Sequence, residues 1–417
     1  MNRRLLVIVT AGFAAMVITA IVACQPVAHT QANTSARANA EFALALLKRV
    51  VEAGGQVSFK ATQTVILWYP TGSDACITNV VHKAPNLTRT EYLPSATATS
   101  GYRIVISDGQ SAWHYEPSLG VVFHMPGAGS RPDRQQKRGT PAGTVAAAGG
   151  SAMPAVDAMS LIEANYEVSL VGTESLVGRK AHVIKLWPRH AGSPSRKIWV
   201  DTELPFILRT EKYGPNGLLS SLSFYNHIEF SPVISDDAFK IQVLPGVAIV
   251  TLPGVEDLVT LEELKKKAGF AVTMPEFVPG GYVFEGGALS PRGSLQVAHL
   301  RFTDGLNTIS YFIAPLTGNE GPLQGDPTIA DQFDMVSLGR RVAFDGVKGQ
   351  LANYQDAKLL RWRTSGYEFT LIGEVDESLL VAMAESVRPP EPPRGPAKEA
   401  FPGQVIKFFY QFFWMSR

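Results

Sequence analysis

Histidine, cysteine and carboxylate side chains are the residues from which this sequence could build catalytic or metal-binding chemistry. The eight histidines are scattered, and no two of them show the HxxxH or HExxH spacing of a helical metal site. The two cysteines, Cys24 and Cys76, are too few for a cysteine-rich zinc module or a disulfide framework. The pattern predicts neither a bound metal nor a cofactor.

Motifs for nucleophilic or phosphate chemistry are also missing from the sequence. Residues 172–180, GTESLVGRK, superficially resemble a phosphate loop, but Arg179 is one residue too many and no Ser or Thr follows Lys180. No GxSxG elbow occurs. The carboxylates fall at turns and helix caps rather than in acid–base pairs. We therefore predict a protein that is not an enzyme, and a hydrolase with a dispersed site remains the alternative.

Length and composition indicate a globular protein of about two domains. The chain has 417 residues, of which 45% are hydrophobic and 18% are charged. The net charge of +1 is not that of a strongly basic protein, so no nucleic-acid partner is predicted.

The N-terminus has the composition of an export signal. Residues 2–4 are a short basic start, and residues 5–23 form an apolar run. The run ends Ile-Val-Ala-Cys at Cys24, which is similar to the bacterial lipobox and predicts cleavage before Cys24 with lipid on its sulfur. An uncleaved membrane anchor is one alternative, since about 20 apolar residues can span a bilayer. Cleavage after a nearby alanine is another, and all three place most of the chain outside the cytoplasm.

The elements that would have to position any site are mostly strands. Residues 197–230 are typical of β-strands almost throughout, and residues 214–217, Gly-Pro-Asn-Gly, predict a hairpin turn. Alternation after the turn predicts that one face carries Leu218, Leu222, Phe224, Ile228 and Phe230, and the other Ser221, Ser223, Tyr225, His227 and Glu229. More strands are expected from residue 57 to residue 125 and from residue 166 to residue 186, with helices over 38–51 and 156–164.

Apolar and aromatic side chains accompany these strands. A long antiparallel sheet must cover its apolar face or curl around it, and a half-open barrel wrapped over the two helices is the economical solution. Such a barrel encloses an apolar cavity suited to acyl chains or an extended apolar peptide. A fully packed core is equally compatible with the composition. The candidate cavity residues are Phe59, Leu67, Trp113, Phe123, Trp199, Phe206, Leu222, Phe224 and Ile228.

A second unit begins near Val250. Thr260 and Glu263 have capping-box spacing, and Gly269 is placed to end the helix that they begin. Strands are expected between residues 282 and 372, followed by a helix over 377–387. These elements predict a small α+β domain with an antiparallel sheet.

Two further segments lack apolar periodicity. Residues 126–154 predict a disordered loop. Its basic cluster could serve an acidic partner or lipid headgroups, or the loop could be a tolerated insertion. Residues 389–417 form a Pro-rich spacer with an aromatic end, Phe408–Trp414, for which docking on the protein's own surface and a place at a membrane interface are both open.

An ordered series of short motifs connects the sequence to a known family. The matching residues include Tyr166-Glu167-Val168, Gly178-Arg179, Trp199-Val200-Asp201, Leu204-Pro205 and Ile228-Glu229-Phe230. This part resembles the N-terminal domain of the MucB/RseB family, itself similar to the lipoprotein carriers LolA and LolB. Downstream, HLRFTDGLNTISYFI and GYEFTLIGEVDESLLVAMAESV resemble the family's C-terminal domain, where a DGL turn precedes a strand.

The resemblance implies an α+β fold, with a LolA/LolB-like half-open antiparallel β-barrel wrapped over helices and a smaller α+β domain. It also implies a periplasmic regulator that binds the periplasmic part of an anti-sigma factor and responds to lipid or lipoprotein. An outer-membrane-lipoprotein carrier or acceptor of the LolA/LolB type is the alternative. The expected divisions are an export signal over 1–24, a tether over 25–37, domains over 38–245 and 250–388, and a tail over 389–417.

Overall fold

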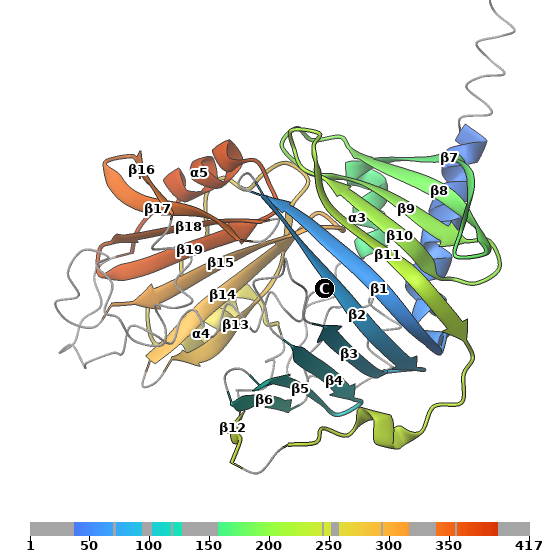
Figure 1. Cartoon of the computed structure of the whole chain (residues 1–417). Helices are drawn as coiled ribbons and strands as arrows, with labels where there is room; N and C mark the ends of the chain where they lie inside the picture. Colours follow the sequence, from blue (N-terminus) through green and yellow to red (C-terminus); the bar gives the residue numbers. More distant parts are fainter. Residues whose placement is uncertain are drawn as a thin grey trace, which may run out of the picture.

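The strands of this protein form two separate sheets, one of twelve strands and one of seven. Figure 1 shows them side by side in the computed structural model. The structure describes residues 37–69, 72–93, 102–117, 120–126, 157–243, 246–251, 258–292, 295–316, 339–354 and 357–390. The predicted export signal with Cys24, nearly all of the predicted loop and all but the first two residues of the predicted tail lie outside these ranges. No helix within them is both long and apolar enough to cross a bilayer.

The first sheet has the order β12-β6-β5-β4-β3-β2-β1-β11-β10-β9-β8-β7, so its end strands are β12 and β7 and the barrel is open. Neighbouring strands are antiparallel, except that β12 runs parallel to β6. The bounds are β1 Phe59–Tyr69, β2 Gly72–Lys83, β3 Leu87–Leu93, β4 Arg103–Asp108, β5 Ser111–Glu116, β6 Val121–Pro126, β7 Tyr166–Leu176, β8 Arg179–Pro188, β9 Ser195–Asp201, β10 Ile207–Tyr213, β11 Leu219–Phe230 and β12 Ala248–Thr251.

Two helical segments pack on one face of this sheet. Residues 37–53 are helical, and α3 (Ala158–Asn165) begins where the Asp157 carboxylate accepts a hydrogen bond from the Met159 N–H. Two short 3-10 turns, η1 (Gly54–Gln56) and η3 (Asp236–Phe239), also belong to this part of the chain. Leu46 and Ile162 are buried in one cluster with residues of β7, β8 and β9. An open antiparallel sheet over helices confirms the predicted α+β class.

The second sheet has the order β13-β14-β15-β19-β18-β17-β16 and carries two helices on one face. Thr260 and Glu263 form the predicted capping box, and Gly269 ends α4 in the left-handed conformation at φ 68°. The bounds are α4 Leu261–Ala268, β13 Val283–Arg292, β14 Leu295–Thr303, β15 Thr308–Pro315, β16 Arg340–Phe344, β17 Val347–Tyr354, β18 Ala357–Thr364, β19 Tyr367–Gly373 and α5 Glu377–Glu385.

A β-bulge interrupts the pairing of β11 with β1. Thr62 lies opposite His227 and Gln63 lies opposite Tyr225, which leaves Asn226 without a counterpart on β1. One extra residue in a strand reverses the alternation of its side chains relative to the neighbouring strand. Every second side chain of β11 therefore points to one side of the sheet before Asn226 and to the other side after it.

This reversal corrects one sequence prediction. Phe224 pairs with Thr64, whereas Ile228 pairs with Ala61. Residues 61 and 64 are an odd number of positions apart on β1, so their side chains face opposite sides of the sheet. The prediction that Phe224 and Leu222 share a face with Ile228 is wrong, because strict alternation does not continue through a bulge.

Candidate functional site at the junction of the two sheets

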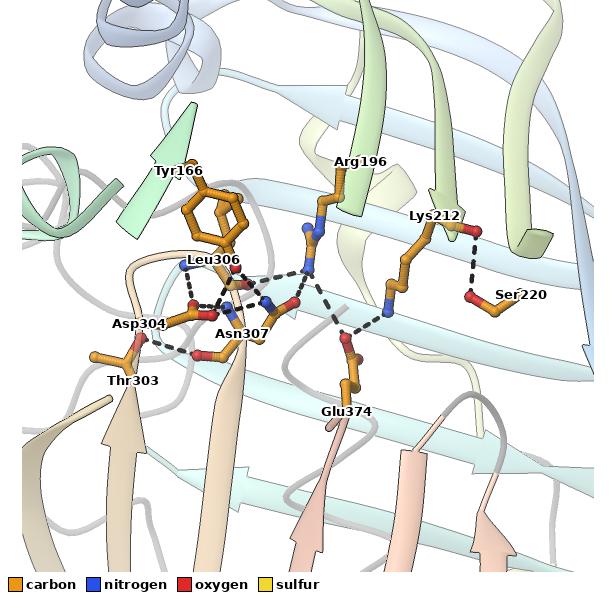
Figure 2. Close-up of polar contacts among 9 residues, drawn as sticks. All are labelled: Tyr166, Arg196, Lys212, Ser220, Thr303, Asp304, Leu306, Asn307 and Glu374. Carbon is orange, nitrogen blue, oxygen red and sulfur yellow. Dashed lines mark hydrogen bonds and ion pairs between the residues drawn. The ribbon is translucent and has the colours of Figure 1, made fainter. Parts of the chain in front are cut away.

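The turn between β14 and β15 reaches the first sheet, as Figure 2 shows. Asp304 is only 2% exposed, and its Oδ1 accepts hydrogen bonds from the N–H groups of Leu306 at 2.8 Å and Asn307 at 2.7 Å. The Thr303 hydroxyl accepts from the Gly305 N–H at 3.1 Å. An Asp side chain that bonds the backbone two and three residues ahead holds a turn in one conformation.

Tyr166, at the start of β7, joins this turn to the first sheet. Its hydroxyl donates to Asp304 Oδ2 at 2.6 Å and accepts from Asn307 Nδ2 at 2.7 Å. The Asn165 amide donates to the carbonyl oxygens of Asp304 and Gly281, at 3.0 and 2.8 Å. Burial and the charge of Asp304 raise the pKa of the Tyr166 phenol. The phenol therefore stays protonated and remains a donor at neutral pH.

Two cations of the first sheet complete the junction. Arg196, on β9, donates from Nη2 to the Leu306 carbonyl at 3.0 Å and to Asn307 Oδ1 at 2.8 Å. Glu374 follows β19, and its Oε2 lies 2.7 Å from Lys212 Nζ and 3.9 Å from Arg196 Nη2. Figure 2 shows this chain of contacts running from the turn to Glu374.

The charge of Glu374 depends on these two partners. Its side chain is 15% exposed and that of Lys212 is 10% exposed, so water screens the pair weakly. Burial alone would raise the pKa of the Glu374 carboxyl, but Lys212 and Arg196 together bring that pKa below its ordinary value. Glu374 is therefore ionised at neutral pH, and the junction contains a compensated cluster of buried charges.

Backbone contact at the junction is close enough to require glycine. Gly305 has φ +99°, and a Cβ there would lie 2.8 Å from the Ala158 carbonyl oxygen and 2.9 Å from the Ile162 nitrogen. The turn therefore lies directly against the backbone of α3. Leu306 continues this contact, because it packs against the cluster under the helices of the first sheet.

The arrangement is suited to fixing one orientation of the two sheets. Paired buried polar groups favour one packing, because the same groups left unpaired are costly. Within the described ranges, no group of three His, Cys, Asp or Glu side chains is placed to hold a metal ion. The paired polar groups of the junction can set the position of surfaces on one sheet relative to surfaces on the other.

Four candidate cavity residues lie together, in a packed cluster of the first sheet. Phe59, Trp199 and Phe206 are buried there, and Ile228 packs against them. The Phe59 and Phe206 rings meet edge to face with centroids 4.9 Å apart. Tyr225, which the sequence analysis placed on the opposite face, also joins this cluster, with its ring centroid 5.2 Å from that of Phe206.

The other candidates are distributed over the sheet. Trp113 pairs with His124 and Phe123 pairs with His114, so Trp113 and Phe123 face opposite sides. Leu67 is half-buried on β1. Since Leu222 and Phe224 also face away from Ile228, the nine candidates cannot line one cavity. A cavity lined by a subset of them stays a prediction.

The junction is not recognisable from the sequence. Tyr166 and the Asp-Gly-Leu turn at 304–306 stand out only as motifs of the family resemblance, and nothing in the sequence indicates that they meet. The partners Tyr166 and Asp304 are 138 positions apart, and Arg196 and Asn307 are 111 apart. Neither pairing follows a local period, so no pattern in the sequence could indicate it.

Comparisons with known proteins place the fold. No family model matches the sequence. An uncharacterized protein of Methanocaldococcus jannaschii is 22% identical over 236 residues, which are 55% of this chain and 63% of that protein. The match therefore spans less than two thirds of that relative's length.

Two solved structures of MucB have a similar overall fold. The Pseudomonas aeruginosa MucA/MucB complex aligns with a TM-score of 0.52 at 19% identity, over 83% of this chain and 98% of that chain. MucB in complex with MucA(peri) aligns with a TM-score of 0.52 at 18% identity, over the same shares. An alignment of this extent includes strands of both sheets. The predicted resemblance to MucB/RseB is confirmed at the level of the fold.

Proposed function

We propose that this protein is a cell-envelope binding protein that binds the periplasmic segment of an anti-sigma factor, without catalysing a reaction. The observation that carries the proposal is the alignment with MucB across both sheets, since MucB is bound to MucA in those structures. The proposal takes residues 38–245 and 250–388 as the two domains that together form the binding protein.

The junction supports this role by preorganising the two sheets. Because the junction holds the two sheets in one relative position, a partner that contacts both would bind with a smaller free-energy cost for ordering them. A lipid-like ligand could release such a partner only by binding another arrangement of the sheets more tightly. Breaking the junction should therefore weaken binding of the protein partner even though no partner-contacting residue is changed.

The proposal includes export from the cytoplasm. Residues 1–24 would direct export, and lipid on Cys24 would hold the protein at a membrane. Replacing Cys24 with Ser should move the protein from the membrane fraction to the soluble periplasmic fraction. Unchanged fractionation would count against lipid attachment while leaving the binding role intact.

Binding itself can be tested directly. The protein, expressed without residues 1–23, is titrated by calorimetry with the periplasmic segment of an anti-sigma factor from the same genome. We expect saturable one-to-one binding, weakened in Tyr166→Phe and unchanged in Tyr213→Phe, whose hydroxyl bonds Glu211 on the face of β10 opposite Lys212. Absence of binding to every such segment, together with copurified acyl chains in mass spectra, would replace the proposal with a LolA/LolB-type carrier.

A further inference from the structure

The first sheet ends in a strand, β12, that is open to solvent. All four of its residues are exposed, and Ile249 and Val250 are large aliphatic residues with exposed fractions of 55% and 40%. β12 pairs with β6 on one side, and Figure 1 shows it at the free end of the sheet. Within the described ranges no strand pairs with its other side, which is therefore a strand edge.

The pairing with β6 identifies which backbone groups of β12 point outward. The Ala248 N–H donates to the Gly120 carbonyl oxygen at 3.2 Å, on the side of β6. Successive residues of a strand direct their N–H and C=O groups to alternate sides, so those of Ile249 and Thr251 point away from β6. These donors and acceptors have the spacing that the backbone of another extended chain can pair with.

The other end strands of the two sheets carry features that discourage such pairing. β7 and β13 each contain a β-bulge, at Val171 and Glu285, and β16 begins with two exposed arginines, Arg340 and Arg341. Bulges and charged side chains are common protection of a sheet edge. β12 has neither, and its sequence, Ala-Ile-Val-Thr, contains no proline. An edge without these features, with aliphatic side chains in solvent, indicates a site for strand pairing.

We propose that the anti-sigma segment binds in an extended conformation and adds to the first sheet as a strand beside β12. In this mode main-chain hydrogen bonds supply affinity, and the neighbouring side chains supply selectivity. Ile249 and Val250 point to opposite faces of the sheet, so the partner residues opposite them are also consecutive. The edge therefore selects a segment with two consecutive apolar residues and no proline between its paired positions. The identity of the partner rests on the proposed function, whereas the open edge does not.

A second copy of this chain fits the same edge less well. A four-residue strand is only about 13 Å long, so two copies joined through β12 alone would bury much less than the about 800 Å² per partner of a stable interface. A peptide segment needs to present only one strand and can follow the protein surface on either side of it. An acyl chain is also unsuited, because it has no donors or acceptors for the backbone groups of Ile249 and Thr251.

Amide hydrogen exchange in the complex tests the backbone pairing. The protein, expressed without residues 1–23, is saturated with the anti-sigma segment, and exchange is followed by mass spectrometry on the peptide that contains residues 246–251. We expect the Ile249 and Thr251 amides to exchange more slowly in the complex, since hydrogen bonding in a sheet protects amides. Unchanged exchange in a complex that forms would overturn this inference and leave the proposed function intact. Absence of any complex would overturn both.

Two substitutions at Ile249 separate the backbone contribution from that of the side chain. Ile249→Pro removes the outward N–H and leaves the groups that bond β6, and proline is tolerated on an edge strand where its position faces solvent. Ile249→Ala shortens the same side chain and keeps the N–H. Calorimetry should show that Ile249→Pro binds the segment about tenfold more weakly than Ile249→Ala, through the lost hydrogen bond and the bulk of the ring.

The same two variants distinguish the other possible occupant. Equal affinities of Ile249→Pro and Ile249→Ala for the segment would overturn the inference. Sedimentation of the free protein gives the second readout, and we expect a monomer in the wild type and in both variants. A wild-type dimer that Ile249→Pro abolishes and Ile249→Ala retains would assign the edge to a second copy, which would also overturn the inference.

Discussion

Tyr166 and Asp304 lie 138 positions apart in the chain, and the Tyr166 hydroxyl donates a 2.6 Å hydrogen bond to the Asp304 carboxylate. This bond links the first strand after α3 to a turn of the second sheet. Because Asp304 also holds the turn that lies against α3, one buried contact couples the local shape of that turn to the relative position of the two sheets.

Removing the Tyr166 hydroxyl tests this coupling. Tyr166→Phe leaves the Asp304 carboxylate and the Asn307 amide each without one partner in a buried site. A buried polar group that loses its partner costs about 1–3 kcal/mol, so the free energy of unfolding should fall by that amount. Urea unfolding followed by circular dichroism measures it. A Tyr166→Phe midpoint equal to that of Tyr213→Phe would contradict a special role for the junction.

Substitution at Gly305 tests the close approach of the turn to α3. Gly305→Ala meets two backbone atoms of α3 at less than 3 Å, whereas a Cβ at Gly217, which also has positive φ, meets nothing within 4 Å. Both variants carry a left-handed strain of about 1 kcal/mol. Gly305→Ala should cost about 1–3 kcal/mol more than Gly217→Ala, through overpacking alone. Equal losses in denaturant unfolding would show that the contact is not tight.

The charge cluster predicts an effect of neutralising Glu374. Glu374→Gln keeps the shape of the side chain but leaves Lys212 and Arg196 without their compensating charge. Breaking a buried pair costs about 3–5 kcal/mol, and the partial exposure of this pair brings the expected loss to about 2–4 kcal/mol. A double-mutant cycle with Lys212→Met should recover part of the loss. Additive losses would mean that the two residues do not interact.

The same cluster predicts a pH dependence. The pKa of Glu374 is lower in the folded protein than in the unfolded chain, so its contribution to stability is complete above the unfolded value and is lost as pH falls through the folded one. The free energy of unfolding should therefore decrease with falling pH below about 4.5, less steeply in Glu374→Gln than in the wild type. Parallel curves for the two proteins would rule out Glu374 as the titrating group.

The bulge at Asn226 predicts which of two neighbouring aromatic residues matters for packing. Tyr225 contacts Phe206 and Phe59, and burial raises the pKa of its phenol. Phe224 lies on the opposite face of the strand. Tyr225→Asp places a carboxylate in the cluster and should prevent folding at 37 °C, whereas Phe224→Asp should give folded protein with a reduced melting temperature. A higher soluble yield of Tyr225→Asp than of Phe224→Asp would contradict the register of β11 on β1.

The local elements of the fold were predictable because their signals lie close together in the chain. The Thr260 and Glu263 pair sets the start of α4 within one helical turn, and Gly269 sets its end. β1 lies where a strand was expected after residue 57, and the turn at 214–217 indicated a hairpin. These effects need only neighbours in the sequence, so they are visible before any tertiary contact is known.

The sequence by itself determined the strands, the helix ends and the α+β class of this protein. The tertiary structure alone decided that Asn226 bulges, that Tyr225 rather than Phe224 enters the cluster, and that Tyr166 meets Asp304. The physical reason is distance along the chain. Alternation and capping arise from residues close together in the chain. Register and junction contacts depend instead on how distant surfaces pack, since the packing that is adopted leaves the fewest buried polar groups unpaired and the least apolar area exposed.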